Sequence, residues 1–187
     1  VVRARRIQGG RGDTVVKLRP VDPAEIDREL RRSASFKTEI DVVPGGFVCS
    51  GSFKGRCTAQ EAKDAVGGKM PLDNLFSKEQ RSFYSKHAPK GIALRSLEAY
   101  GPTFVLKARK WIKQLDRRLV VEMWLFPDGS RNLEISMKCE PSEAFQVAQE
   151  AKEYFKGIGI ELSADQQTKT RAAMQFFQPE VRKSEAK

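Results

Sequence analysis

The feature that most constrains this chain is the alternation of charged and apolar residues along short segments. Residues two apart in a β-strand share a face, so this pattern predicts strands with one apolar and one charged face. The predicted strands span residues 1–7, 13–19, 36–43, 103–110, 117–126 and 131–139. Their charged faces carry, in chain order, Arg3, Arg5, Lys17, Arg19, Lys37, Glu39, Asp41, Lys107, Arg109, Arg118, Glu122, Glu134 and Lys138.

Turn and capping residues predict how these strands are connected. Glycines in 8–12 and the run Pro127–Ser130 indicate hairpins, and residues 47–50 indicate a short additional strand. Capping boxes at Thr58 and Ser77 predict two helix starts. Further helices are expected over 22–32, from Pro141 to Gly157, and from a capping box at Ser163 to about Phe177. The chain is therefore predicted to be α+β with antiparallel strands.

The length of 187 residues and the 40% hydrophobic content suit one well-packed domain. We expect this domain to span residues 1–178, with a helical insertion at about 58–100. The charged segment 179–187 is expected to be a flexible tail.

Two interpretations of the charged strand faces remain open. In the first, they form the solvated outer side of an antiparallel sheet. In the second, the strands close into a barrel and the charged faces line its interior. Charges recur at adjacent same-face positions, as Arg-x-Arg, Lys-x-Arg and Glu-x-Asp, which favours an ordered site. Buried charge is tolerable only when it is paired or held by a ligand.

The overall charge narrows the class of partner. The net charge of +10 favours polyanions, namely nucleic acid, an anionic membrane or phosphorylated metabolites, and does not choose among them. The 3 Cys lack a C-x-x-C pair and there is 1 His, which disfavours a disulfide framework and a structural zinc site. These counts suit a reducing cytoplasm. No apolar run is long enough to span a membrane, so no membrane partner is expected.

The ordered series of motifs covers most of the chain. Its stretches are residues 1–6, 15–19, 37–41, 117–124, 133–138 and 168–171. The series resembles the CYTH family, the triphosphate tunnel metalloenzymes, and in particular the bacterial CYTH-domain proteins labelled adenylate cyclase-like. Two features depart from the family. Its first-strand motif Glu-x-Glu-x-Lys is absent, and the chain begins without Met, from which we expect a missing N-terminal strand. Ser136 also stands where many members have a second glutamate.

The resemblance implies a closed antiparallel barrel of about eight strands. It also implies metal-dependent chemistry on triphosphates, with Mg²⁺ or Mn²⁺ as the cofactor. The residues that it places in a phosphate cradle are Arg3, Arg5, Lys17, Arg19, Lys107, Arg109, Arg118 and Arg171. The implied metal ligands are Glu39, Asp41, Glu122 and Glu134, and Glu39, Asp41 and Lys138 are the implied catalytic residues.

These expectations lead to three hypotheses of function. The first is a metal-dependent hydrolase of inorganic or organic triphosphates, such as tripolyphosphate or ATP. The second is an adenylate cyclase that forms cyclic AMP in the same site. The third is a non-catalytic module that binds polyphosphate, nucleotide or nucleic acid, for which a steep salt dependence is expected.

Overall fold

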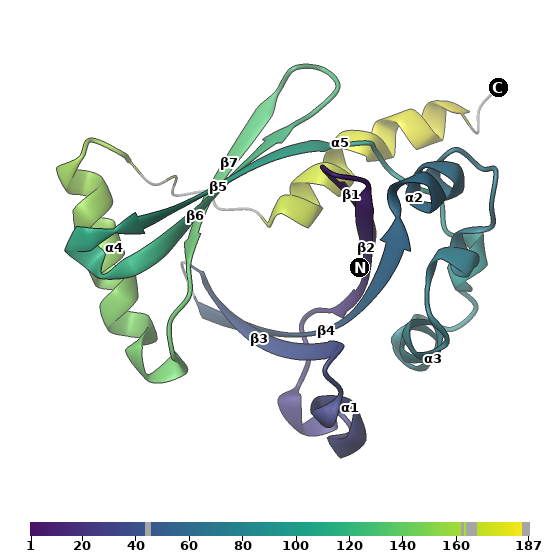
Figure 1. Ribbon diagram of the computed structural model, residues 1–187, viewed down its shortest axis with the longest axis horizontal. Helices are drawn as coiled ribbons and strands as arrows, with labels where there is room; N and C mark the ends of the chain where they lie inside the picture. The colour runs from purple at the N-terminus through teal and green to yellow at the C-terminus, as the bar shows by residue number, and fades with distance from the viewer. Residues whose placement is uncertain (44–45, 162, 164–167, 185–187) are drawn as a thin grey trace. The chain divides into compact units, whose positions relative to one another are not determined.

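The computed structural model describes residues 1–43, 46–161, 163 and 168–184. The chain divides into two compact units, Val1–Ala99 and Tyr100–Lys187. Each unit is built on its own antiparallel sheet with helices beside it (Figure 1). The predicted α+β class with antiparallel strands is therefore confirmed.

The first unit contains a 4-stranded sheet in the order β1-β2-β4-β3 (Figure 1). The strands are β1 (Val2–Ile7), β2 (Arg11–Leu18), β3 (Phe36–Val43) and β4 (Gly46–Thr58). β1 and β2 form the predicted hairpin, in which Arg5 lies opposite Asp13. Glycines at 9 and 10 have φ values of 94° and 85°, the left-handed conformation that a tight turn requires. The strands predicted over 1–7, 13–19 and 36–43 are confirmed, although Arg19 lies just beyond the end of β2.

The strand predicted at 47–50 is confirmed, but it was predicted too short, because β4 continues to Thr58. The segment after residue 50 contains Gly51 and Gly55, which lower strand propensity. Close packing explains why glycine stands there. A Cβ at Gly51 would lie 2.8 Å from Phe36 Cζ, and one at Gly55 would lie 2.5 Å from Thr14 Oγ1. These glycines therefore mark close approach to neighbouring groups and do not end the strand.

Helices cover one face of this sheet. α2 (Ala59–Val66) and α3 (Lys78–His87) begin at the predicted capping boxes of Thr58 and Ser77, which are both formed. The two helices predicted for this segment are thus confirmed, and they lie within residues 59–87. The helix predicted over 22–32 is instead a 3₁₀ turn at Pro23–Glu25 and the short helix α1 (Arg28–Arg32), because Asp22 and Asp27 each start a separate turn. The apolar sheet face and these elements form a core around Val16, Phe36, Phe53, Phe76 and Phe83.

One buried polar side chain links α3 to the sheet. Gln80 is fully buried, and its Oε1 accepts hydrogen bonds from Thr14 Oγ1 at 3.0 Å and from the backbone N–H of Ser77 at 3.1 Å. Its Nε2 donates to the carbonyl of Phe53 at 3.1 Å. The side chain that completes the helix cap therefore also fixes the helix on β2 and β4.

The second unit contains a 3-stranded antiparallel sheet in the order β5-β6-β7. β5 (Phe104–Ile112), β6 (Arg117–Leu125) and β7 (Arg131–Met137) match the predicted strands, and the turn at Pro127–Ser130 joins the last two. α4 (Ala144–Gly157) ends at the predicted glycine. It packs on one sheet face, where Ile112, Leu119 and Phe155 form the core.

The last helix, α5 (Lys169–Ser184), differs from its prediction at its C-terminal end. The capping box expected at Ser163 involves residues that lie outside the described ones. The helix continues to Ser184, beyond the end predicted near Phe177, although Pro179 disfavours helix by removing a backbone donor. Phe176 and Phe177 pack against Phe126, with ring centroids 4.9 Å and 6.4 Å apart, and so hold the helix in its unit.

None of the helices in the described part of the chain is both long and apolar enough to cross a bilayer.

Candidate functional site

The sheet of the first unit has a face on which basic side chains predominate. Residues opposite one another in adjacent strands share a face, so the register assigns each charge. Arg5, Asp13 and Arg56 form one row across β1, β2 and β4, and the next row contains Arg3 and Lys54. We call this surface the basic face; its cations on the strands are Arg3, Arg5, Lys17, Lys37, Lys54 and Arg56, and Arg19, just beyond β2, joins them through its ion pair with Asp41. The structure thus places the predicted cations of residues 1–19 together, on the side opposite the apolar core.

The acidic residues of this face are fewer, and two of them pair with predicted cations. Arg5 Nε donates to Asp13 Oδ1 at 3.1 Å. Asp41 Oδ2 lies 3.1 Å from Arg19 Nη1 and 3.8 Å from Lys17 Nζ. Glu39 shares the face and is half-buried, and its backbone carbonyl accepts a hydrogen bond from Ser50 Oγ. The predicted pair Glu39 and Asp41 is therefore on the expected face, where Asp41 serves as a counter-ion for two cations.

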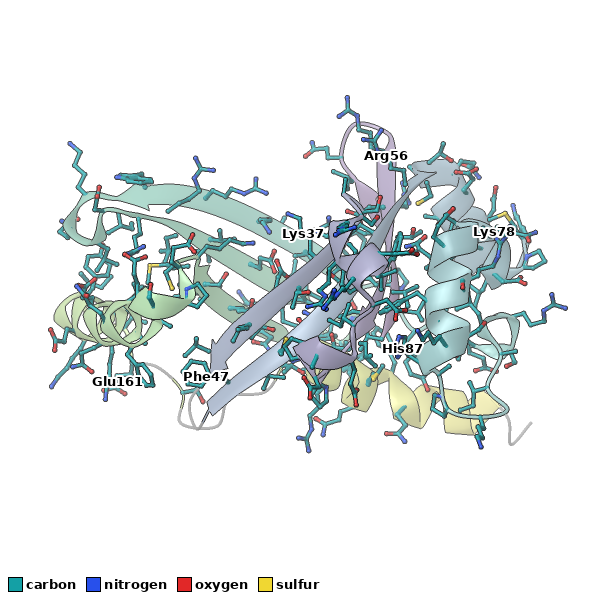
Figure 2. All side chains as sticks on the ribbon, turned by 90° about the horizontal axis from the view of Figure 1, so that it is seen from below. Lys37, Phe47, Arg56, Lys78, His87 and Glu161 are labelled. Carbon is teal, nitrogen blue, oxygen red and sulfur yellow. The ribbon has the colours of Figure 1, made fainter. Side chains whose placement is uncertain are left out.

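The cations that remain exposed include residues that the sequence analysis missed. Lys37, Lys54 and Arg56 are exposed and form no ion pair with any other described residue. Figure 2 labels Lys37 on β3 and Arg56 on β4, with Lys78 on α3 for comparison. Lys54 and Arg56 were missed because β4 was predicted to end at residue 50. The alternation Ser52-x-Lys54-x-Arg56 was the signal that could have found them.

The sheet of the second unit has a row of charge on the face that carries Glu122. Lys107, Glu122 and Glu134 lie opposite one another on β5, β6 and β7. Lys107 Nζ donates to Glu122 Oε1 at 2.5 Å. Lys169, the first residue of α5, donates to Glu122 Oε2, and its Nζ lies 2.5 Å from Glu134 Oε1. We call these four residues the carboxylate row. The structure therefore brings two predicted metal ligands together and places a lysine ammonium between them.

The protonation state of Glu122 follows from its surroundings. Its side chain is only 13% exposed. Burial raises the pKa of a carboxyl group, but the hydrogen bonds and charges of Lys107 and Lys169 outweigh burial and lower the pKa of Glu122 to about 2. Glu122 is therefore a carboxylate at neutral pH, held between two cations.

Trp124 adjoins the carboxylate row on the same face of β6. Lys169 Nζ lies 5.7 Å from the centroid of its ring, within the range of a cation–π interaction. The indole Nε1 is buried and has no hydrogen-bond partner among the described residues. A buried donor without a partner is costly, typically about 1–3 kcal/mol. The site thus has a donor that an oxygen atom of a ligand or of water could satisfy.

The other site residues predicted for this unit are exposed and lie outside the carboxylate row. Arg109 and Arg118 are exposed on the same sheet face. Lys138 is exposed just beyond the end of β7. Arg171 is exposed on α5, and residues two apart on a helix do not share a side, so it does not point where Lys169 does. Lys169, and not Arg171, is the basic residue of 168–171 that reaches the carboxylates. No sequence signal indicated this, because its partners are distant in the chain.

The donor chemistry of the carboxylate row is compatible with a divalent cation. Two carboxylates already hold a positive ammonium, and Mg²⁺ is commonly bound by one or two carboxylates together with water and phosphate oxygens. Within the described ranges no group of three or more His, Cys, Asp or Glu residues is placed to hold a metal ion. Glu122 and Glu134 would therefore supply two ligands, and the others would come from water or substrate.

Comparisons of the chain with protein-family models, with curated proteins and with solved structures find no match.

Proposed function

We propose that this chain binds a triphosphate-containing small molecule together with Mg²⁺ or Mn²⁺ and hydrolyses it, as a member of the CYTH family. The observation that carries the proposal is the carboxylate row, in which two carboxylates and two lysines meet on one sheet face. This combination can hold a cation and the phosphate oxygens that accompany it. The family assignment itself rests on the sequence motifs.

In this proposal the cationic residues bind the phosphate oxygens and the carboxylates bind the metal ion. Lys107 and Lys169 each donate to Glu122, and their ammonium groups are donors of the kind that bind phosphate oxygens. The unpartnered Trp124 Nε1 supplies a further donor. Two arginines, Arg109 and Arg118, lie on the same sheet face, and the planar donors of an arginine match phosphate oxygens. A bound divalent cation would polarise a phosphoryl oxygen or activate water for attack.

The basic face of the first unit supports phosphate binding independently. Its exposed cations Lys37, Lys54 and Arg56 are not neutralised by described carboxylates. Arg3, Lys17 and Arg19 are the further phosphate-binding candidates there, and Glu39 and Asp41 are the candidate metal or catalytic carboxylates. The closed barrel stays a prediction, and the proposal does not require it because each sheet carries its own charged face.

The exposure of the basic face favours one alternative, a non-catalytic module for polyphosphate or nucleic acid. Exposed lysines and arginines bind a phosphate backbone without selecting a reaction. Such a module would bind polyanions with a steep salt dependence and would tolerate the loss of Glu39 and Glu134. The cyclase alternative shares the phosphate cradle with the hydrolase and differs from it in the product.

The proposal is tested by product analysis. The protein is incubated with tripolyphosphate or ATP and either Mg²⁺ or Mn²⁺, and products are separated by ion-exchange chromatography. We expect orthophosphate, and we expect Glu134→Gln and Glu39→Gln to reduce turnover by about a hundredfold while the fold is retained. Cyclic AMP and pyrophosphate from ATP would instead identify a cyclase.

Binding is measured in parallel by calorimetry with tripolyphosphate. Lys54→Ala and Arg56→Ala should each weaken binding by about tenfold, since each removes a charge-assisted hydrogen bond. Lys78→Ala, on α3, removes the same charge outside the sheet and should have little effect. Binding that survives in all variants, without metal-dependent product, would contradict the proposal. Single-stranded DNA that binds as tightly as tripolyphosphate would support the binding module.

A further inference from the structure

We infer that Lys169 is a tethered counter-ion for Glu122 and Glu134, and that its ammonium and a divalent cation compete for this carboxylate pair. The inference rests on the proposed metal site and adds a regulatory residue to it. Lys169 has no specific role among the residues predicted from the sequence.

The geometry of Lys169 is that of a bound cation. Its Nζ contacts Glu122 Oε2 and lies 2.5 Å from Glu134 Oε1, so one ammonium bridges carboxylates from two adjacent strands. Glu122 and Glu134 are cross-strand partners, and Lys107 occupies the other oxygen of Glu122. A divalent cation that binds both carboxylates would need the position that the ammonium holds.

The site is sufficiently enclosed for the competition to be strong. The side chains of Glu122, Lys169 and Glu134 are 13%, 23% and 34% exposed. Charges that are largely removed from water interact more strongly than exposed pairs and are screened less by salt. A divalent cation at the position between Glu122 and Glu134 would strongly repel the Lys169 ammonium that lies there, so binding of the metal requires this ammonium to leave.

The start of α5 makes Lys169 easier to release. Thr168 precedes it, and the hydroxyl and carbonyl of Thr168 accept from the backbone N–H groups of Arg171 and Ala172 at 3.3 Å and 3.0 Å. These bonds fix the helix start at Lys169. A cation at a helix N-terminus opposes the helix dipole, which is unfavourable. The carboxylates offset this cost, and a phosphate that took their place would offset it too.

The competition predicts a simple exchange. When a metal ion takes Glu122 and Glu134, the ammonium moves from the carboxylates and is free to donate to a phosphate oxygen. Phosphate and metal would then favour the same arrangement, and the protein without them would keep its carboxylates neutralised. No covalent step is involved.

The test measures Mn²⁺ binding directly, from the electron paramagnetic resonance signal of the free ion. Lys169→Met should bind Mn²⁺ at least about tenfold more tightly than the wild type. Lys169→Arg keeps the charge and should stay close to the wild type. Lys152→Met, on the exposed side of α4, removes the same charge away from the row and should not change the affinity. Adding Glu122→Gln to Lys169→Met should abolish the gain.

A second readout follows the ammonium itself. The chain has 2 Trp, so Trp111→Phe leaves Trp124, beneath Lys169, as the only fluorophore of this type. In this background Mg²⁺ should change the Trp124 emission, and the additional change Lys169→Met should remove the part of the response due to lysine departure. Each variant is first checked by circular dichroism for a native fold.

The outcomes separate this inference from the proposed function. Tighter Mn²⁺ binding in Lys169→Met alone supports the competition. Equal Mn²⁺ affinity in the wild type and Lys169→Met overturns it, and tripolyphosphate turnover in the same samples then shows that the proposed function stands. Absence of Mn²⁺ binding in all variants overturns it as well, and absence of tripolyphosphate turnover in those samples also contradicts the proposed function.

Discussion

Single side chains in this protein often perform two tasks. Gln80 completes the cap of α3 and at the same time bonds to Thr14 and to the carbonyl of Phe53. Glu122 accepts from two lysines on different elements. Such residues are sensitive points, because one substitution breaks contacts in two places.

Gln80→Ala is predicted to destabilise the protein by about 2–3 kcal/mol, since it leaves buried groups of Thr14 and Phe53 without their partner. Urea unfolding followed by circular dichroism measures the loss. Gln60→Ala, on the exposed side of α2, is the matched control and should cost well under half as much. Equal losses in the two variants would show that Gln80 acts only as a helix residue.

The capping box of α2 gives a prediction for pH. The backbone N–H of Thr58, and then its hydroxyl, hold the pKa of Glu61 below its usual range. A carboxyl group whose pKa is lower in the folded than in the unfolded protein stabilises the fold. This stabilisation is fully present above the pKa of the unfolded state and is lost as pH falls through the pKa of the folded state. Glu61→Gln keeps the capping contacts without the charge. Its stability, measured by urea unfolding between about pH 3 and pH 6, should therefore fall less than that of the wild type on acidification. Parallel curves would contradict this origin of the pH dependence.

At the scale of elements, β4 shows how packing overrides local propensity. The strand passes through Gly51 and Gly55, and β2 and β3 pair on its two sides. Gly55 has no side chain where Thr14 and Gln80 meet. The glycine is thus part of the contact between α3 and the sheet, and it permits the continuation that brings Lys54 and Arg56 onto the basic face.

Gly55→Ala is predicted to destabilise the protein by about 1–3 kcal/mol, because the added methyl group overlaps the Thr14 hydroxyl and the Gln80 amide. Combining it with Gln80→Ala tests the cause. Removing the Gln80 amide relieves part of the overlap, so the double variant should lose less stability than the sum of the single losses. If the loss of stability in the double variant equals the sum of the two single losses, Gly55 is needed only for its backbone conformation.

At the scale of the whole molecule, the division into two units raises the question whether each unit folds by itself. All residues of the core around Val16 and Phe53 belong to the first unit, and those around Ile112 and Phe155 belong to the second. Each sheet also has its own helical cover. Separate cores and separate sheets are the properties expected of units that fold by themselves.

We predict that a fragment of residues 1–99 folds alone, with dispersed amide resonances in NMR spectra and a cooperative unfolding transition in urea. The fragment contains the complete sheet and core of its unit and the whole basic face. The fragment should still bind tripolyphosphate. It should not hydrolyse it, because the carboxylate row lies in the second unit. A collapsed fragment without dispersed resonances would show that the first unit needs the rest of the chain.

The sequence by itself determined the strands, the charged face of each strand and the capped helix starts at Thr58 and Ser77. These features depend on the period of the side chains and on contacts between residues three or four apart. It did not determine the length of β4, because the glycines that lower its local propensity are required by close contacts, of Gly51 with Phe36 and of Gly55 with Thr14 and Gln80. Only the tertiary structure decided that Lys169 bridges Glu122 and Glu134. That contact joins the start of a helix to two strands that are distant in the chain, and no local pattern of residues predicts a contact of this kind.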